Sequence, residues 1–78
     1  MTLKNATESK DYIIDNISTN DEELEAFLFS LGCYSGETIH LTSQLRNGCI
    51  VVIKNSRYHI DNPLAGAIAV HESGGNAV

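Results

Sequence analysis

The stretch LGCYSGETI, residues 31–39, decides the fold, because a helical apolar pattern ends in it and an alternating strand pattern begins. Downstream, Ile39 and Leu41 alternate with polar residues, which is the two-residue period of a half-buried strand. Upstream, apolar side chains recur at the i, i+3, i+4 and i+7 spacing of one helical face, at Leu24, Phe27, Leu28 and Leu31. The stretch is therefore predicted to be a tight joint between a helix and a strand.

Gly32 is predicted to end the helix in a left-handed conformation, which costs glycine little because it has no Cβ. Cys33 and Leu28 then occupy the two positions that make the apolar contact of a Schellman cap. This arrangement predicts a packing role for Cys33, with a reactive thiol as the alternative.

The start of the helix carries two possible capping boxes. Thr19 with Glu22, or equally Asn20 with Glu23, has the spacing at which each side chain satisfies a backbone N–H near the other. Negative charge on the first turns suits the positive end of a helix, and it comes from Asp21, Glu22, Glu23 and Glu25.

Runs of alternating or β-branched residues predict five strands, at Tyr12–Ile17, from Gly36 through Thr42, at Cys49–Ile53, around Tyr58 and Ile60, and at Ala67–His71. The isoleucines of the first strand break strict alternation, which indicates a bulge or burial on both faces. The largest core candidates are the aromatic residues Phe27, Phe29, Tyr12, Tyr34 and Tyr58.

Turn signals separate these strands. Asn47-Gly48 predicts the turn between the second and third strands, and Asn55-Ser56 is a weaker second turn. Pro63 interrupts pairing before a single turn at Leu64–Gly66. With one helix between the first two strands, the chain is predicted to be mainly β: a small, partly open antiparallel barrel of about five strands.

Length and charge narrow the classes of protein. The 78 residues predict one domain, 1–78, with flexible ends at 1–10 and 72–78, of which the first holds one apolar residue, Leu3, that can dock on the domain. Ten acidic against five basic residues give a net charge of −5, which disfavours nucleic acid as a partner. Residues 1–37 hold eight acids and two lysines, so an acidic face is expected as solvated surface or, alternatively, as a means of steering a partner.

Direct membrane insertion is not expected. The longest uncharged run, Asn62–Val70, is far shorter than the roughly 20 apolar residues that span a bilayer. Cys33 and Cys49 lack the paired spacing of a zinc site, and no secretory signal precedes them, so a reducing, cytoplasmic setting is expected.

Catalytic and metal chemistry are poorly supported. No nucleophile stands beside a base, and no glycine-rich phosphate loop is present, so neither an enzyme nor a cofactor is predicted. His40, His59 and His71 are ligand types, as are the two cysteines, but none is paired at short spacing. Each histidine is expected on the outer face of a different strand, where solvent exposure is the ordinary outcome. His59 and His71 are the weak metal candidates.

The order of these elements resembles the ferrous iron transport protein A family, FeoA, from about residue 2 to residue 71. The helix ending in Leu-Gly, the glycine turn into the second strand and a closing Ala followed by Ile-x-Val carry the resemblance, on Leu31, Gly32, Gly36, Ala65, Ile68 and Val70. Leu3 stands where the family has an early leucine.

The resemblance implies an SH3-like β-barrel in the cytoplasm that assists ferrous iron uptake by contact with FeoB, a membrane transporter with a cytosolic G domain. It implies no catalytic or metal-binding residue. Two features depart from the family pattern, because many relatives carry basic residues in the helix and after the fourth strand, where this chain has its acidic run and Asp61.

Three alternatives remain at this point. Similar barrels form the C-terminal domains of iron-dependent repressors, but nothing precedes the barrel here, which favours the transport accessory. A small metal carrier or sensor would use the histidines and cysteines. A generic SH3-like interaction module would need a groove with exposed aromatic residues, for which Tyr34 and Tyr58 are the candidates, and self-association stays open.

Overall fold

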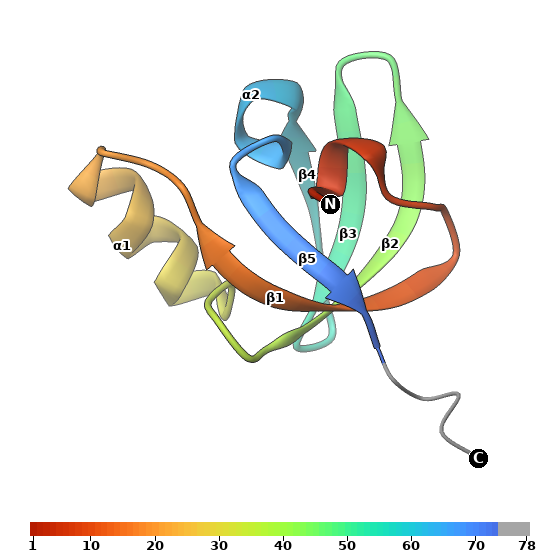
Figure 1. Cartoon of the computed structure of the whole chain (residues 1–78), viewed down its shortest axis with the longest axis horizontal. Coiled ribbons are helices and arrows are strands. Elements are labelled where there is room, and N and C mark those ends of the chain that lie inside the picture. The colour runs from red at the N-terminus through yellow and green to blue at the C-terminus, as the bar shows by residue number, and fades with distance from the viewer. Residues whose placement is uncertain (74–78) are drawn as a thin grey trace.

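The structure, a computed structural model, describes residues 1–73. Five antiparallel strands form one sheet: β1 (Lys10–Ile17), β2 (Thr38–Leu45), β3 (Gly48–Ile53), β4 (Ser56–Asp61) and β5 (Ile68–Glu72). Their order across the sheet is β4-β3-β2-β1-β5, so β4 and β5 are edges and the curled sheet does not close (Figure 1). The predicted mainly β fold, a partly open five-stranded barrel, is confirmed.

Three short helices join or precede the strands. They are η1 (Leu3–Asn5), α1 (Glu22–Leu31) between β1 and β2, and α2 (Asn62–Ala65) between β4 and β5. Figure 1 shows α1 to one side of the sheet, at the end where β1 leaves it. Pro63 lies in the first turn of α2, where its missing N–H removes no helical hydrogen bond, so the turn predicted from Leu64 begins two residues earlier.

Both hairpin turns are formed. Leu45 pairs with Gly48 across the β2–β3 turn, as the Asn47-Gly48 signal predicts. The β3–β4 turn is centred on Lys54 and Asn55, one residue before the predicted position. Both have positive φ, 49° and 71°, as the central pair of a type I′ hairpin turn requires.

The irregular pattern of β1 is a bulge. Ile14 pairs with Val70 of β5, but Asn16 pairs with Ala69, so Asp15 is the extra residue. The bulge turns Asp15 and Asn16 both toward solvent after the buried Ile14. This confirms the bulge alternative for the first strand.

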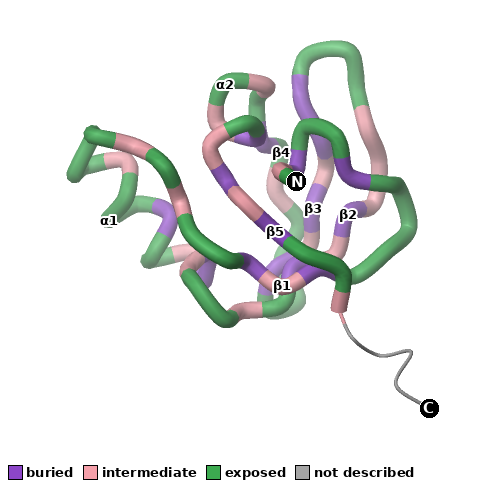
Figure 2. Tube along the Cα trace, viewed as in Figure 1, coloured by how far each residue is buried: buried purple, intermediate pink, exposed green. Residues whose placement is uncertain are grey.

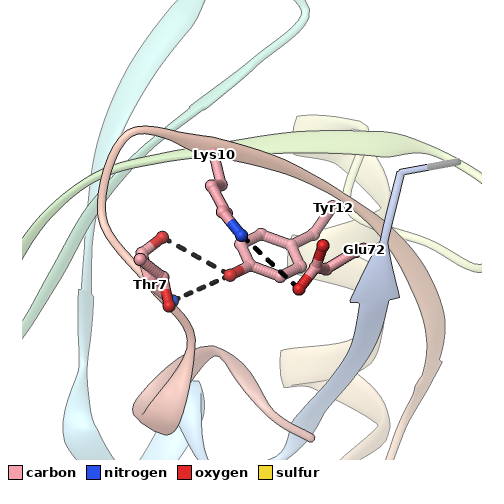
Figure 3. A network of polar contacts seen from close by, with 4 residues as sticks. All are labelled: Thr7, Lys10, Tyr12 and Glu72. Atoms are coloured by element: carbon pink, nitrogen blue, oxygen red, sulfur yellow. Dashed lines mark hydrogen bonds and ion pairs between the residues drawn. The ribbon is translucent and has the colours of Figure 1, made fainter. Parts of the chain in front are cut away.

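The core lies inside the curl of the sheet (Figure 2). Tyr12 is the largest fully buried side chain of this core. The Tyr12 hydroxyl oxygen accepts a hydrogen bond from the Thr7 N–H at 2.8 Å, so this polar group has a partner inside the domain (Figure 3). The other fully buried large side chains are Leu3, Ile14, Leu28, Ile39, Leu41, Ile53, Ile68, Val51, Val70, Cys33 and Cys49. Phe27 and Phe29 are exposed, so their prediction as core residues is wrong.

The N-terminal segment packs along β5. The Val70 N–H donates to the Met1 carbonyl at 2.9 Å, and Leu3 is fully buried, so the one apolar residue of this segment does dock on the domain. The Gln44 side-chain amide of β2 holds the segment from the other side, donating to the carbonyls of Leu3 and Ala6 at 2.9 Å each.

The structure describes the whole N-terminal segment but only the first part of the predicted C-terminal tail. Of the tail predicted at 72–78, Glu72 belongs to β5, and residues 74–78 lie outside the described residues. Within residues 1–73, every helix is too short to span a bilayer, the longest having ten residues.

Candidate functional site

The joint after α1 is a complete Schellman cap. Gly32 has φ 92°, the Cys33 N–H donates to the Leu28 carbonyl at 2.9 Å, and the Gly32 N–H donates to the Phe29 carbonyl at 3.0 Å. Both bonds satisfy carbonyls that the helix end would leave free. Cys33 and Leu28 belong to the same buried cluster, as the predicted apolar contact requires.

The first turn of α1 is capped by Asp21. One of its carboxylate oxygens accepts the Glu23 N–H at 3.0 Å and the Leu24 N–H at 3.1 Å. The predicted capping boxes of Thr19 and Asn20 are therefore wrong, because a carboxylate one or two residues closer takes the same free donors. The Thr19 hydroxyl accepts the Asp21 N–H instead, at 3.1 Å.

α1 buries only a narrow side of its surface. Leu28 is its one fully buried residue, and Leu24 packs against the core in part. Phe27 is 55% exposed and Phe29 is 64% exposed, and Figure 2 shows most of the helix as exposed. The described part of the chain thus presents two exposed aromatic side chains on one short helix.

Phe29 stacks on Tyr34 of the joint. The ring centroids are 4.7 Å apart at an interplanar angle of 29°. Lys54 of the β3–β4 turn lies over the Tyr34 ring at 6.0 Å, and its Nζ is 2.9 Å from a carboxylate oxygen of Glu37. The hydrogen bond and charge of Glu37, followed by the charge of Tyr34, raise the pKa of Lys54. These contacts restrict the positions open to the exposed pair.

Two grooves share the stacked pair as a wall. The larger, called the helix groove, has a volume of about 570 Å³ and lies between the end of β1 and α1, lined among others by Ile17, Glu22, Glu25, Ala26, Phe29 and Tyr34. The smaller, called the hairpin groove, has a volume of about 340 Å³ and is lined among others by Phe29, Leu31, Tyr34, Ile53, Lys54 and Tyr58. Both aromatic candidates for a peptide-binding groove, Tyr34 and Tyr58, thus line the same groove.

The cysteines are free and buried. Desolvation raises the pKa of the Cys33 thiol from 9.0 to about 11, and burial also raises that of Cys49. Because the thiolate is the nucleophile, both side chains are inert at neutral pH. The packing role predicted for Cys33 agrees with this environment.

The histidines lie on three strands, and two of them pair with aspartates. His40 Nδ1 is 2.7 Å from an Asp11 carboxylate oxygen, and His71 Nδ1 is 2.6 Å from an Asp15 carboxylate oxygen. His59 and His71, the weak metal candidates, belong to the two edge strands β4 and β5. Within residues 1–73, no three histidine, cysteine or carboxylate side chains lie close enough to hold a metal ion together.

Sequence reasoning did not identify Phe29 as a surface residue. A signal was present, because Phe27 and Phe29 are two positions apart and residues with that spacing point to different sides of a helix. At least one of the two had to lie away from the buried stripe. The contact of Phe29 with Tyr34 depends on the turn after Gly32 and has no comparable signal.

Comparison with known proteins supports one family. The model of the FeoA domain matches residues 1–72. A search of the curated proteins finds no significant match.

Solved structures share the fold. An iron uptake regulatory protein (FeoA) has a TM-score of 0.83 and 24% identity over 94% of this chain and 97% of that one. The iron(II) transport protein A of Clostridium thermocellum has a TM-score of 0.84 and 22% identity over 96% of this chain and 47% of that one. A manganese-dependent transcriptional repressor has a TM-score of 0.83 and 17% identity over 94% and 41%. This chain spans less than half the length of the last two.

Proposed function

This chain belongs to the FeoA family, whose domain covers residues 1–72, and we propose that it serves ferrous iron transport by binding the cytosolic part of an FeoB-type membrane transporter. The family membership carries the proposal, because it spans nearly the whole chain and the family has a role in ferrous iron transport. Iron enters this role as the cargo of the transporter.

The proposed role is accessory and not catalytic. Burial raises the pKa of the Cys33 thiol to about 11 and also raises that of Cys49, so neither buried cysteine is an activated nucleophile. Regulation by contact needs only an exposed surface, and α1 supplies one in Phe27 and Phe29. The role requires a cytoplasmic location, in which the two free thiols stay reduced.

A titration tests the proposal directly. The whole chain is titrated by calorimetry against the cytosolic domain of the transporter from the same organism, with and without guanine nucleotide and at two salt concentrations. Saturable binding is expected, with affinity that falls as salt rises because this chain is acidic. Absence of binding in every condition, together with normal iron uptake after deletion of the gene, would contradict the proposal.

A small metal carrier or sensor is the second candidate. It draws on the two histidine–aspartate pairs of the outer sheet face, His40 with Asp11 and His71 with Asp15, which are acceptable ligand types for ferrous iron. Anaerobic titration with ferrous iron, with zinc in parallel, decides between the two. A metal that binds only the folded chain raises its melting temperature, whereas an unchanged melting curve rejects the carrier.

A further inference from the structure

We infer that the helix groove is the docking site for a basic segment of a partner protein, one that places a bulky apolar side chain against Phe29 and a lysine or arginine beside Glu22 and Glu25. This inference rests on the proposed function and deepens it by naming the surface and the chemistry of the bound segment. Three observations carry it.

The first observation is an exposed aromatic wall in which one ring stacks on another. Phe29 is 64% exposed although it is the side chain that stacks on Tyr34, and the apolar side chains of Ile17 and Ala26 line the same groove. Exposed aromatic side chains that are already held in place lose little conformational entropy on binding, which is why they are enriched at interaction sites. The wall is therefore suited to an apolar anchor.

The second observation is size. A volume of about 570 Å³ lies within the range of about 300–1,000 Å³ in which small ligands and anchoring side chains are bound. The hairpin groove, at about 340 Å³, is smaller and is lined by the charged Lys54. Of the two grooves, the helix groove offers the larger apolar wall.

The third observation is the sign of the charge. Glu22 and Glu25 line the helix groove, and among residues 1–73 no lysine, arginine or histidine lines it. Lys54, whose Nζ lies 6.0 Å from the centre of the Tyr34 ring, lines the hairpin groove instead and is paired with Glu37 at 2.9 Å. Since Glu23 and the N-cap residue Asp21 add two more carboxylates at the same end of α1, the rim attracts a cationic segment and repels an acidic one. An anionic lipid surface is disfavoured for the same reason.

Matched variants of the whole chain test the surface. Phe29→Ser removes the aromatic wall, and Phe27→Ser removes the other exposed phenylalanine of α1, which lines neither groove. Binding to the cytosolic domain of the transporter is expected to weaken by roughly tenfold or more for Phe29→Ser, as for a central aromatic anchor, and by less than about twofold for Phe27→Ser. Circular dichroism and thermal melting establish that both variants are folded.

A second pair of variants tests the charge. Glu25→Lys reverses a carboxylate that lines the groove, whereas Glu23→Lys makes the same change on the same helix outside it. Glu25→Lys is expected to weaken binding by roughly fivefold or more, because Glu25 lines the groove, and Glu23→Lys by clearly less, because a charge outside the groove acts only through screened attraction. Equal effects within both pairs would overturn the inference while leaving the proposed function in place.

Synthetic peptides keep the inference testable if the transporter domain does not bind at all. The acetylated and amidated peptide GRLFRLG is titrated into ¹⁵N-labelled protein, with GELFELG as the charge-inverted control. Amide shifts at Ala26, Phe29 and Ser35 with the basic peptide alone support the inference. No shifts, equal shifts with both peptides, or shifts that follow protein concentration alone would overturn it, the last because a second copy of this chain would then be the occupant.

Discussion

Gly48 shows how a single position can be constrained by close packing. It begins β3 opposite the end of β4, and a Cβ built there would overlap the Ile60 carbonyl oxygen and lie 2.9 Å from the Asp61 Cα. Those are backbone atoms of a paired strand, so they cannot move aside as a flexible side chain would. Gly32 is constrained differently, by its left-handed φ of 92° at the end of α1.

Gly48→Ala is therefore expected to lower the free energy of unfolding by about 3 kcal/mol, as overpacking against an unyielding neighbour does. Gly66→Ala is the control, because Gly66 has a helical φ of −71° and a Cβ there would meet its nearest atom at an ordinary 3.5 Å. Urea unfolding of both variants measures the difference. Equal stability of the two variants would contradict the close approach at Gly48.

Because of Cys33, the free energy of unfolding is expected to fall as the pH becomes alkaline. Its pKa is raised from 9.0 to about 11 in the folded chain, so the folded state holds the proton more tightly than the unfolded one. The resulting stabilisation is fully present below pH 9 and is lost as pH rises from about 9 to 11, a total of about 2–3 kcal/mol at 1.36 kcal/mol per pKa unit. Urea unfolding under reducing conditions at pH 8, 9, 10 and 11 measures it.

Cys33→Ala supplies the control for that pH dependence. The variant removes the thiol, so its unfolding free energy should fall less between pH 9 and 11 than that of the parent chain. The other titratable groups remain in both chains and cancel in the comparison. Parallel pH profiles for the two chains would show that the thiol does not contribute.

At the scale of elements, α1 is held by the caps at its two ends and by the one narrow face that packs against the core. Asp21 caps its start with two hydrogen bonds, and the Schellman bonds around Gly32 close its end. Between them, only Leu28 is fully buried. A helix of ten residues is marginal by itself, so the caps contribute a large share of what holds α1 in the helical state.

Asp21→Ala is expected to destabilise α1 by about 1 kcal/mol, because two N–H groups lose their acceptor. Since few contacts tie α1 to the sheet, the loss should appear first as faster amide hydrogen exchange within Glu22–Leu31, with β2 and β3 still protected. Asn20→Ala, at the exposed position before the cap, should leave the exchange rates within about twofold of the parent chain. Unchanged exchange in Asp21→Ala would contradict the capping role.

At the scale of the whole molecule, the start of the chain completes the core. Thr2 forms a bridge with Ala69 of β5, and Leu3, the third residue, is fully buried. The segment thus lies along the edge strand β5 and also contacts β3 and α2. Chain ends usually contribute little to stability. This one is an exception because Leu3 is buried in the core.

Leu3→Ala is accordingly expected to cost about 2–5 kcal/mol of unfolding free energy, the range for a large-to-small change in a core. Lys4→Ala, one residue further along in the same short helix and exposed, should change stability by less than about 0.5 kcal/mol. Thermal and urea unfolding measure both. A Leu3→Ala variant as stable as Lys4→Ala would show that the segment does not contribute to the core.

Much of the fold could be predicted from neighbouring residues. The bulge in β1, the Asn47-Gly48 hairpin and the helix end at Gly32 all depend on contacts between residues close in sequence or on the period of the apolar pattern. The surface around α1 could not be predicted in this way. Whether Phe27 and Phe29 are covered depends on the angle at which α1 leaves the sheet, and that angle is set by contacts between segments far apart in the chain.

The amino-acid sequence alone determined the element order, the joint at residues 31–39 and the packing role of Cys33, because helix caps, turns and strand periods are set by interactions within a few residues. The three-dimensional packing decided that Phe29 stacks on Tyr34 in the open, that acidic side chains line the groove beside it, and that Leu3 completes the core. These features join residues that only a folded sheet brings together, and local hydrogen-bonding preferences do not specify which distant side chains meet.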